Sequence, residues 1–68
     1  MRTPIRIDKT SSVIVSTVQK IDDRFHTDSW TWKDFVGVVG GIKTHRITSD
    51  VDEAVINHIA IVREFEDA

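Results

Sequence analysis

The chain contains no cysteine, and this absence constrains a sequence of 68 residues more than any other feature. A domain of this length buries only about 60% of the surface that its unfolded chain exposes. Many domains of this size therefore gain stability from disulfides, a bound metal or a second subunit. Disulfides and thiolate zinc sites both require cysteine. We therefore expect residues 1–68 to form a single small domain, stabilised by an economical fold or by self-association.

The composition is typical of a globular protein in a reducing compartment. Hydrophobic residues make up 40% of the chain and charged residues 29%, which argues against disorder. No apolar run approaches the ~20 residues that a membrane helix needs. The segment Met1-Arg2-Thr3-Pro4 lacks the apolar stretch of a secretory signal. We predict a cytoplasmic protein with no membrane association, and a complete short gene product.

The spacing of apolar residues predicts a mainly α domain, with an N-terminal helix at about residues 11–25. Four apolar residues there recur at spacings of four, three and four, as on one face of a helix: Ile14, Val18, Ile21 and Phe25. A short middle helix is predicted at about residues 31–39. Thr31 and Asp34 would form a variant capping box, and Gly40-Gly41 would end this helix.

A long C-terminal helix at about residues 50–65 is the clearest prediction. Ser49 and Asp52 have the spacing of an N-terminal cap, and the first turn is acidic, as the helix dipole favours. Apolar residues occupy most of the circumference of this helix. Such a helix either lies at the centre of a core or pairs with another element or molecule.

The β-branched content of the chain supports an alternative, an α+β fold. Val, Ile and Thr account for 25 of the 68 residues, and there is no leucine. These side chains suit strands better than helices. In this alternative, strands at 35–39 and 42–48 form a hairpin that turns at Gly40-Gly41, a dipeptide suited to a two-residue loop.

The sequence shows no pattern that is typical of an enzyme or of a metal or cofactor site. The three histidines, His26, His45 and His58, do not have the spacing of metal ligands on a helix. The chain has no G-x-S-x-G motif around a serine nucleophile. Only one residue separates Gly41 from Lys43, which is too short a spacing for a phosphate-binding loop. We therefore predict no catalytic residues, no cofactor and no metal.

Two tryptophans are the most informative side chains. Tryptophan is enriched in protein interfaces, because it buries a large area and offers one N–H donor. In a strand, Trp30 and Trp32 would face the same side. We predict a small non-catalytic protein-binding module: an adaptor, an inhibitor or an accessory regulator of the kind that phages and bacteria encode. We expect it to self-associate as a homo-oligomer. The residues predicted to bind protein are Trp30, Trp32, Phe35, Ile56 and Ile61.

Nucleic-acid association is the alternative function. Residues 1–33 carry a net charge of +2 and residues 34–68 a net charge of −4, by count of the charged side chains. Scattered cations suffice for phosphate contacts. An acidic helix N-terminus, however, is the wrong charge to place against DNA. The residues predicted for this alternative are Arg2, Arg6, Lys9, Lys43 and Arg46.

Overall fold

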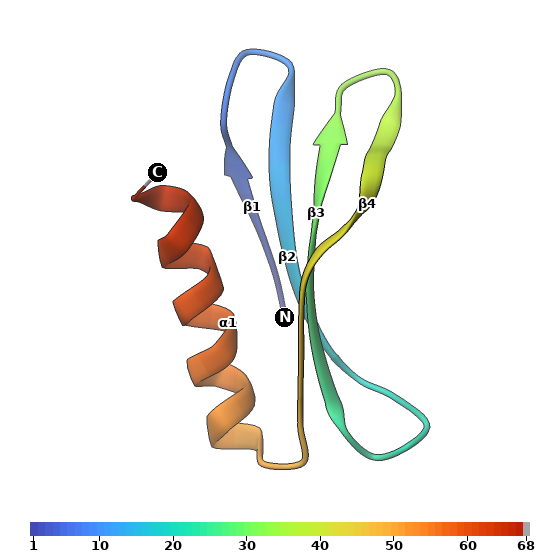
Figure 1. Ribbon diagram of the computed structural model, residues 1–68, viewed down its shortest axis with the longest axis vertical. Coiled ribbons are helices and arrows are strands. Elements are labelled where there is room, and N and C mark those ends of the chain that lie inside the picture. The colour runs from blue at the N-terminus through green and yellow to red at the C-terminus, as the bar shows by residue number, and fades with distance from the viewer. Residues whose placement is uncertain (68) are drawn as a thin grey trace.

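The computed structural model describes residues 1–67, which form an antiparallel sheet followed by one helix (Figure 1). The elements are β1 (Arg2–Arg6), β2 (Ser11–Gln19), β3 (Phe25–Lys33), β4 (Gly37–Thr48) and α1 (Val51–Glu66). Each strand pairs with the next one along the chain, so the order in the sheet is β1-β2-β3-β4. After a short turn, α1 runs back along the sheet (Figure 1).

The prediction of a mainly α domain is wrong, because residues 11–25 and 31–39 are largely strand and turn. The apolar residues spaced like a helical face in the first segment lie in three different elements. Val18 belongs to β2, Ile21 is fully exposed in the following turn, and Phe25 begins β3. The run of β-branched residues and serine in β2 instead alternates between the two faces of the sheet. Strand preference, together with pairing to β1 and β3, therefore outweighed a coincidental helical spacing.

The α+β alternative is closer to the structure, but its hairpin turn is misplaced. The β3–β4 hairpin turns at residues 34–36, where the backbone N–H of Val36 donates to the carbonyl of Lys33 at 3.1 Å. Gly40-Gly41 instead lies within β4. Ser29 pairs with Thr44, whereas Thr31 pairs with Val39, so β4 holds extra residues at this point. Gly40, with φ of +73°, provides the left-handed conformation that such an irregularity requires.

The C-terminal helix is confirmed, with bounds one residue later than predicted at each end. Its N-cap is Asp50, whose carboxylate accepts from the backbone N–H of Asp52 at 2.8 Å, so the prediction that Ser49 is the cap is wrong. Asp52 and Glu53 lie in the first turn and Arg63 in the last, as the helix dipole favours.

The register of the sheet assigns its side chains to two faces. Thr3 and Thr17 hydrogen-bond to His58 of α1, so they lie on the face that the helix covers. Residues that pair directly share a face, and neighbours along a strand alternate between faces. Val13 and Val15 therefore also face α1. Ile14 and its partner Trp30 lie on the opposite face, which α1 does not cover.

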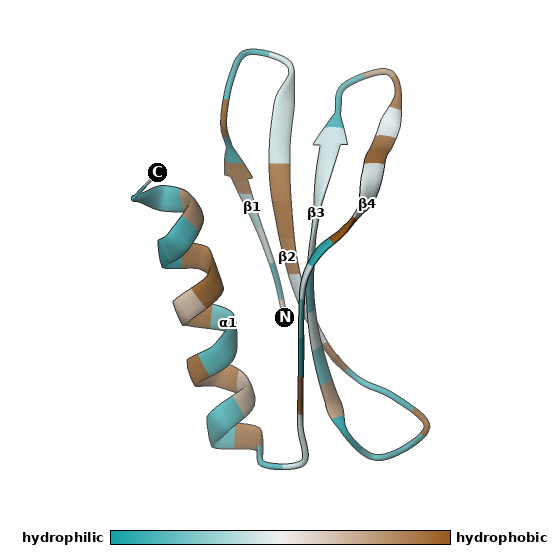
Figure 2. Cartoon of the chain, in the orientation of Figure 1, coloured by the Kyte–Doolittle hydropathy of each residue, from teal (hydrophilic) through white to brown (hydrophobic). Residues whose placement is uncertain are grey.

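The core between α1 and the sheet is small and unusually polar. In residues 1–67, four apolar side chains are no more than 3% exposed: Val13, Val15, Ala54 and Ile61. Five buried polar residues lie on the same side of the sheet or on α1 itself: Ser11, Thr17, Thr27, Ser29 and His58. In Figure 2, β2 is brown over its middle, whereas most of β3 is pale or teal. Hydrogen bonds must therefore replace part of the apolar packing in this interior.

A network around His58 provides those hydrogen bonds. The ring nitrogen Nε2 is 2.8 Å from Thr3 Oγ1, and Nδ1 is 2.8 Å from Thr17 Oγ1. Thr17 Oγ1 is in turn 2.8 Å from Thr27 Oγ1. One side chain of α1 is thus joined to β1, β2 and β3. Burial lowers the pKa of His58 from its ordinary value of 6.5, and the positive charge of the N-terminal ammonium lowers it further.

Stability should therefore increase with pH as His58 becomes neutral. Because the pKa of His58 is lower in the folded state, the unfolded chain binds a proton first as the pH falls through 6.5. We expect the contribution of His58 to the free energy of unfolding to be complete above that pH. It should decline towards the lower folded-state pKa and then level off.

Urea denaturation between about pH 5 and 8 measures this dependence. His58→Gln, which does not titrate, is the control. The free-energy difference between the wild-type protein and the variant should shrink as the pH falls. Parallel pH profiles for the two proteins would contradict the assignment.

Candidate functional site

The uncovered face of the sheet presents both tryptophans side by side. Trp30 and Trp32 are two residues apart on β3, so their side chains share a face, as predicted for a strand. Trp30 pairs with Ile14 on β2, and Trp32 pairs with Val38 on β4. Trp32 is 43% exposed. The pairing of β2, β3 and β4 therefore brings large apolar side chains from three strands together on one surface.

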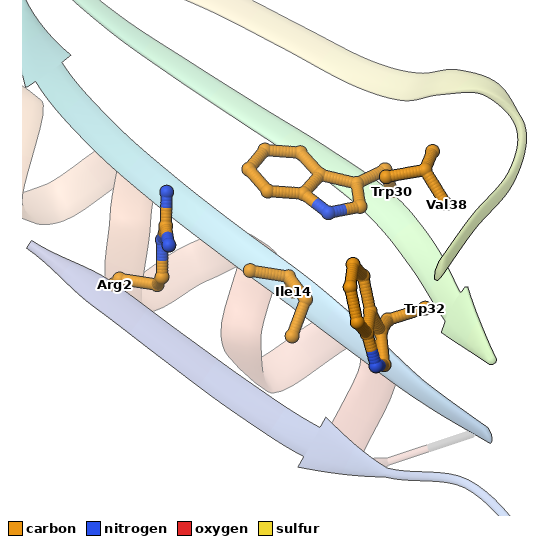
Figure 3. A pocket seen from close by; sticks show the side chains of 5 residues that line it. All are labelled: Arg2, Ile14, Trp30, Trp32 and Val38. Atoms are coloured by element: carbon orange, nitrogen blue, oxygen red, sulfur yellow. The ribbon is translucent and has the colours of Figure 1, made fainter. Parts of the chain in front are cut away.

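These side chains surround a hollow of about 410 Å³ (Figure 3). It is lined by Arg2, Ile14, Trp30, Trp32 and Val38. In Figure 3, α1 passes behind the strands and the lining side chains stand in front of them. The guanidinium carbon of Arg2 lies 5.8 Å from the centroid of the Trp30 ring, a cation–π distance. The hollow has the volume of a small-ligand site, with an apolar lining and one fixed positive charge. We refer to it as the tryptophan hollow.

Phe35 stands at the tip of the hairpin that carries Trp32 and Val38. It is fully exposed, and its φ of +66° lies in the left-handed region. A bulky residue rarely adopts this conformation, which costs roughly 1–2 kcal/mol. The tight turn between β3 and β4 imposes this conformation, as the β2–β3 turn does at Asp23, with φ of +62°.

The other half of the uncovered face is polar. Nδ1 of His45 hydrogen-bonds to Oδ1 of Asp28, and Nε2 of His26 lies 3.0 Å from Oδ2 of Asp22. The two histidine rings are 5.6 Å apart between centroids. The backbone N–H of Arg24 and the bond from His26 hold the pKa of Asp22 below its usual value. His26 is buried and His45 is about half exposed, and each of them pairs with a carboxylate.

This polar half does not have the geometry of a serine hydrolase. Ser16 pairs with Asp28 across β2 and β3, and Asp28 pairs with His45 across β3 and β4. In a catalytic triad the histidine stands between the nucleophile and the acid. Here the carboxylate of Asp28 occupies the middle position instead. No group of three potential metal ligands comes together within residues 1–67.

The remaining predicted binding residues lie on α1, away from the hollow. Ile56 is 64% exposed on the helix, whereas Ile61 is only 1% exposed and packs in the core with Val13 and Val15. We therefore leave Ile61 out of any contact surface. The sequence did not show that Ile61 is buried, because apolar residues occupy most of the helix circumference and do not single out one buried face.

The basic residues predicted for nucleic-acid association do not form one surface. Arg2 lines the hollow, while Arg6 on the same strand is 3.1 Å from Asp34 in an ion pair. Arg46 pairs with Thr27, whose side chain joins the network on the helix-covered face. The other two lie apart, Lys9 in the β1–β2 turn and Lys43 in the irregular part of β4.

The fold and the hollow define a four-stranded antiparallel sheet that is covered on one face by a helix and open for contact on the other. No family model, no curated protein and no solved structure matches this chain. In residues 1–67, α1 is too short and too polar to cross a membrane.

Replacing Phe35 should stabilise the fold. Asparagine tolerates the left-handed region better than other non-glycine residues, so Phe35→Asn relieves strain without removing any buried contact. We expect the free energy of unfolding to rise by about 0.5–1 kcal/mol. Val36→Asn, at the next and also exposed position of the turn, is the control. A loss of stability in Phe35→Asn would show that the ring makes contacts within the monomer.

Proposed function

We propose that the protein is a small, self-associating, non-catalytic module that binds a partner protein in the cytoplasm through the tryptophan hollow. The observation that carries the proposal is that Trp30 and Trp32 meet on a face that α1 leaves uncovered. Tryptophan and arginine are the residue types that dominate binding energy in protein interfaces. An adaptor, an inhibitor or an accessory regulator would use such a surface.

The lining of the hollow indicates what the partner offers. Two aliphatic side chains, Ile14 and Val38, and two indole rings favour an inserted aliphatic or aromatic side chain. Arg2 supplies one positive charge beside Trp30, so a carboxylate next to the inserted side chain would be favoured. The exposed ring of Phe35 extends the apolar surface at the hairpin tip. We therefore expect a polypeptide segment that carries an apolar anchor next to an acidic residue.

Truncating Trp32 should weaken partner binding by tenfold or more. A photo-crosslinking residue at position 38, on the wall of the hollow, would capture the partner for identification. The purified partner is then titrated against the protein, with tryptophan fluorescence as the readout. Loss of a central aromatic anchor costs about 2 kcal/mol or more, which is more than a tenfold change in Kd.

Ile21→Ala is the matched control, because Ile21 is a fully exposed apolar residue outside the hollow. It should bind the partner as the wild-type protein does. Equal affinities of Trp32→Ala and Ile21→Ala for the captured protein would refute the proposal.

Single-stranded nucleic acid is the second candidate partner, favoured by the stacking of Arg2 over Trp30. Bases stack on exposed aromatic rings while arginine holds the backbone phosphate. A single-stranded oligonucleotide titrated at low salt distinguishes the candidates. Nucleic-acid binding would quench the tryptophans with an affinity that falls steeply as salt rises. We expect no such binding, because Asp34 neutralises Arg6 and the chain carries a net charge of −2.

A further inference from the structure

The outward face of α1 carries a stripe of two isoleucines between opposite charges. The stripe consists of Asp52, Ile56, Ile59 and Arg63, at spacings of four, three and four. Each member lies two positions before a residue that packs against the sheet: Ala54, His58, Ile61 and Phe65. Two positions correspond to about 200° of rotation around a helix, so the stripe points away from the sheet. We call these four residues the outer stripe.

Both isoleucines of the outer stripe are exposed. Ile56 is 64% exposed and Ile59 is 44% exposed. The spacing of four and three is that of the seam through which two helices pack against each other. Within residues 1–67 the structure contains no ion pair at Asp52 or at Arg63, so both charges are available to a second molecule.

We propose that two copies of this chain associate through the outer stripe, with their helices antiparallel about a two-fold axis. This inference rests on the self-association in the proposed function and names its surface. When Ile56 of one copy lies beside Ile59 of the partner subunit, the equal spacings place Asp52 beside Arg63 of the partner subunit. The two-fold axis repeats both contacts, as it does in any symmetric dimer.

The charges select this orientation and a second copy as the occupant. In a parallel pair, Asp52 would face Asp52 of the partner subunit, and the two arginines would face each other. Like charges at close range disfavour that arrangement. The antiparallel pair instead matches both charges and buries four isoleucines, two from each copy. The outer stripe is therefore complementary to itself.

Sedimentation velocity on the full chain, at concentrations from about 1 to 100 µM, tests the pairing. The wild-type protein should dimerise. Asp52→Arg and Arg63→Asp should each weaken the dimer about tenfold, because each substitution turns two attractive contacts into two repulsive ones. The double variant, Asp52→Arg with Arg63→Asp, should recover the wild-type affinity. An equimolar mixture of the two single variants should form the heterodimer in preference to either homodimer.

Glu53→Arg is the matched control, because it adds the same charge to the same helical turn but lies off the outer stripe. It should dimerise as the wild-type protein does. Ile56→Lys should abolish the dimer while circular dichroism shows an intact fold, since this side chain is mostly exposed.

If neither charge reversal nor Ile56→Lys changes the affinity of the dimer, the helix pairing is overturned. Self-association would then occur through another surface. A protein that stays monomeric throughout the concentration range would overturn both the helix pairing and the self-association in the proposed function. Trp32→Ala reports on the tryptophan hollow alone and should leave the dimer unchanged.

Discussion

The hydrogen-bond network of His58 is the interaction on which the rest of the structure depends. It joins one side chain of α1 to threonines of β1, β2 and β3, and so fixes the position of the helix over the sheet. A buried hydrogen bond contributes only about 0.5–1.5 kcal/mol net, but a polar group left unpaired costs more than that. The network therefore specifies one arrangement of helix and sheet more than it stabilises it. Neutral His58 serves this role, since burial and the N-terminal ammonium both oppose its protonation.

A polar interior changes where the apolar side chains lie. Because threonines, serines and a histidine fill much of the space under α1, the apolar cluster there is limited to Val13, Val15 and Ile61 with a few partly buried neighbours. Other large apolar residues remain on the surface, and two groups of them are organised. One lines the tryptophan hollow on the uncovered face of the sheet, and the other forms the outer stripe of α1. These two groups are the surfaces through which we propose that the protein makes its contacts.

The sequence predicted α1 but misassigned the sheet, and the physical reason differs between the segments. At residues 50–65, helical spacing and an acidic first turn agreed, so local and overall signals pointed to one structure, although the cap is Asp50 and not Ser49. At residues 11–25 the spacing of Ile14 and Val18 suggested a helix while the β-branched content suggested a strand. Pairing with β1 and β3, which a local pattern does not reveal, decided between them. The same limit applies to the hollow. The shared face of Trp30 and Trp32 was foreseeable for a strand, but Arg2 and Val38 reach it only through the register of neighbouring strands.

The two organised surfaces lie on opposite sides of the molecule, and this placement makes them compatible. α1 covers one face of the sheet, so pairing through its outer stripe puts the two helices at the centre of the dimer and turns both uncovered faces outward. Each tryptophan hollow then stays open. Association through the hollows themselves would instead bury the site that is proposed to bind a partner. A dimer with two outward hollows can engage two segments at once, and the second contact then forms at a raised effective concentration. Self-association in this geometry would therefore strengthen the capture of a repetitive or oligomeric partner without any additional contact in the hollow.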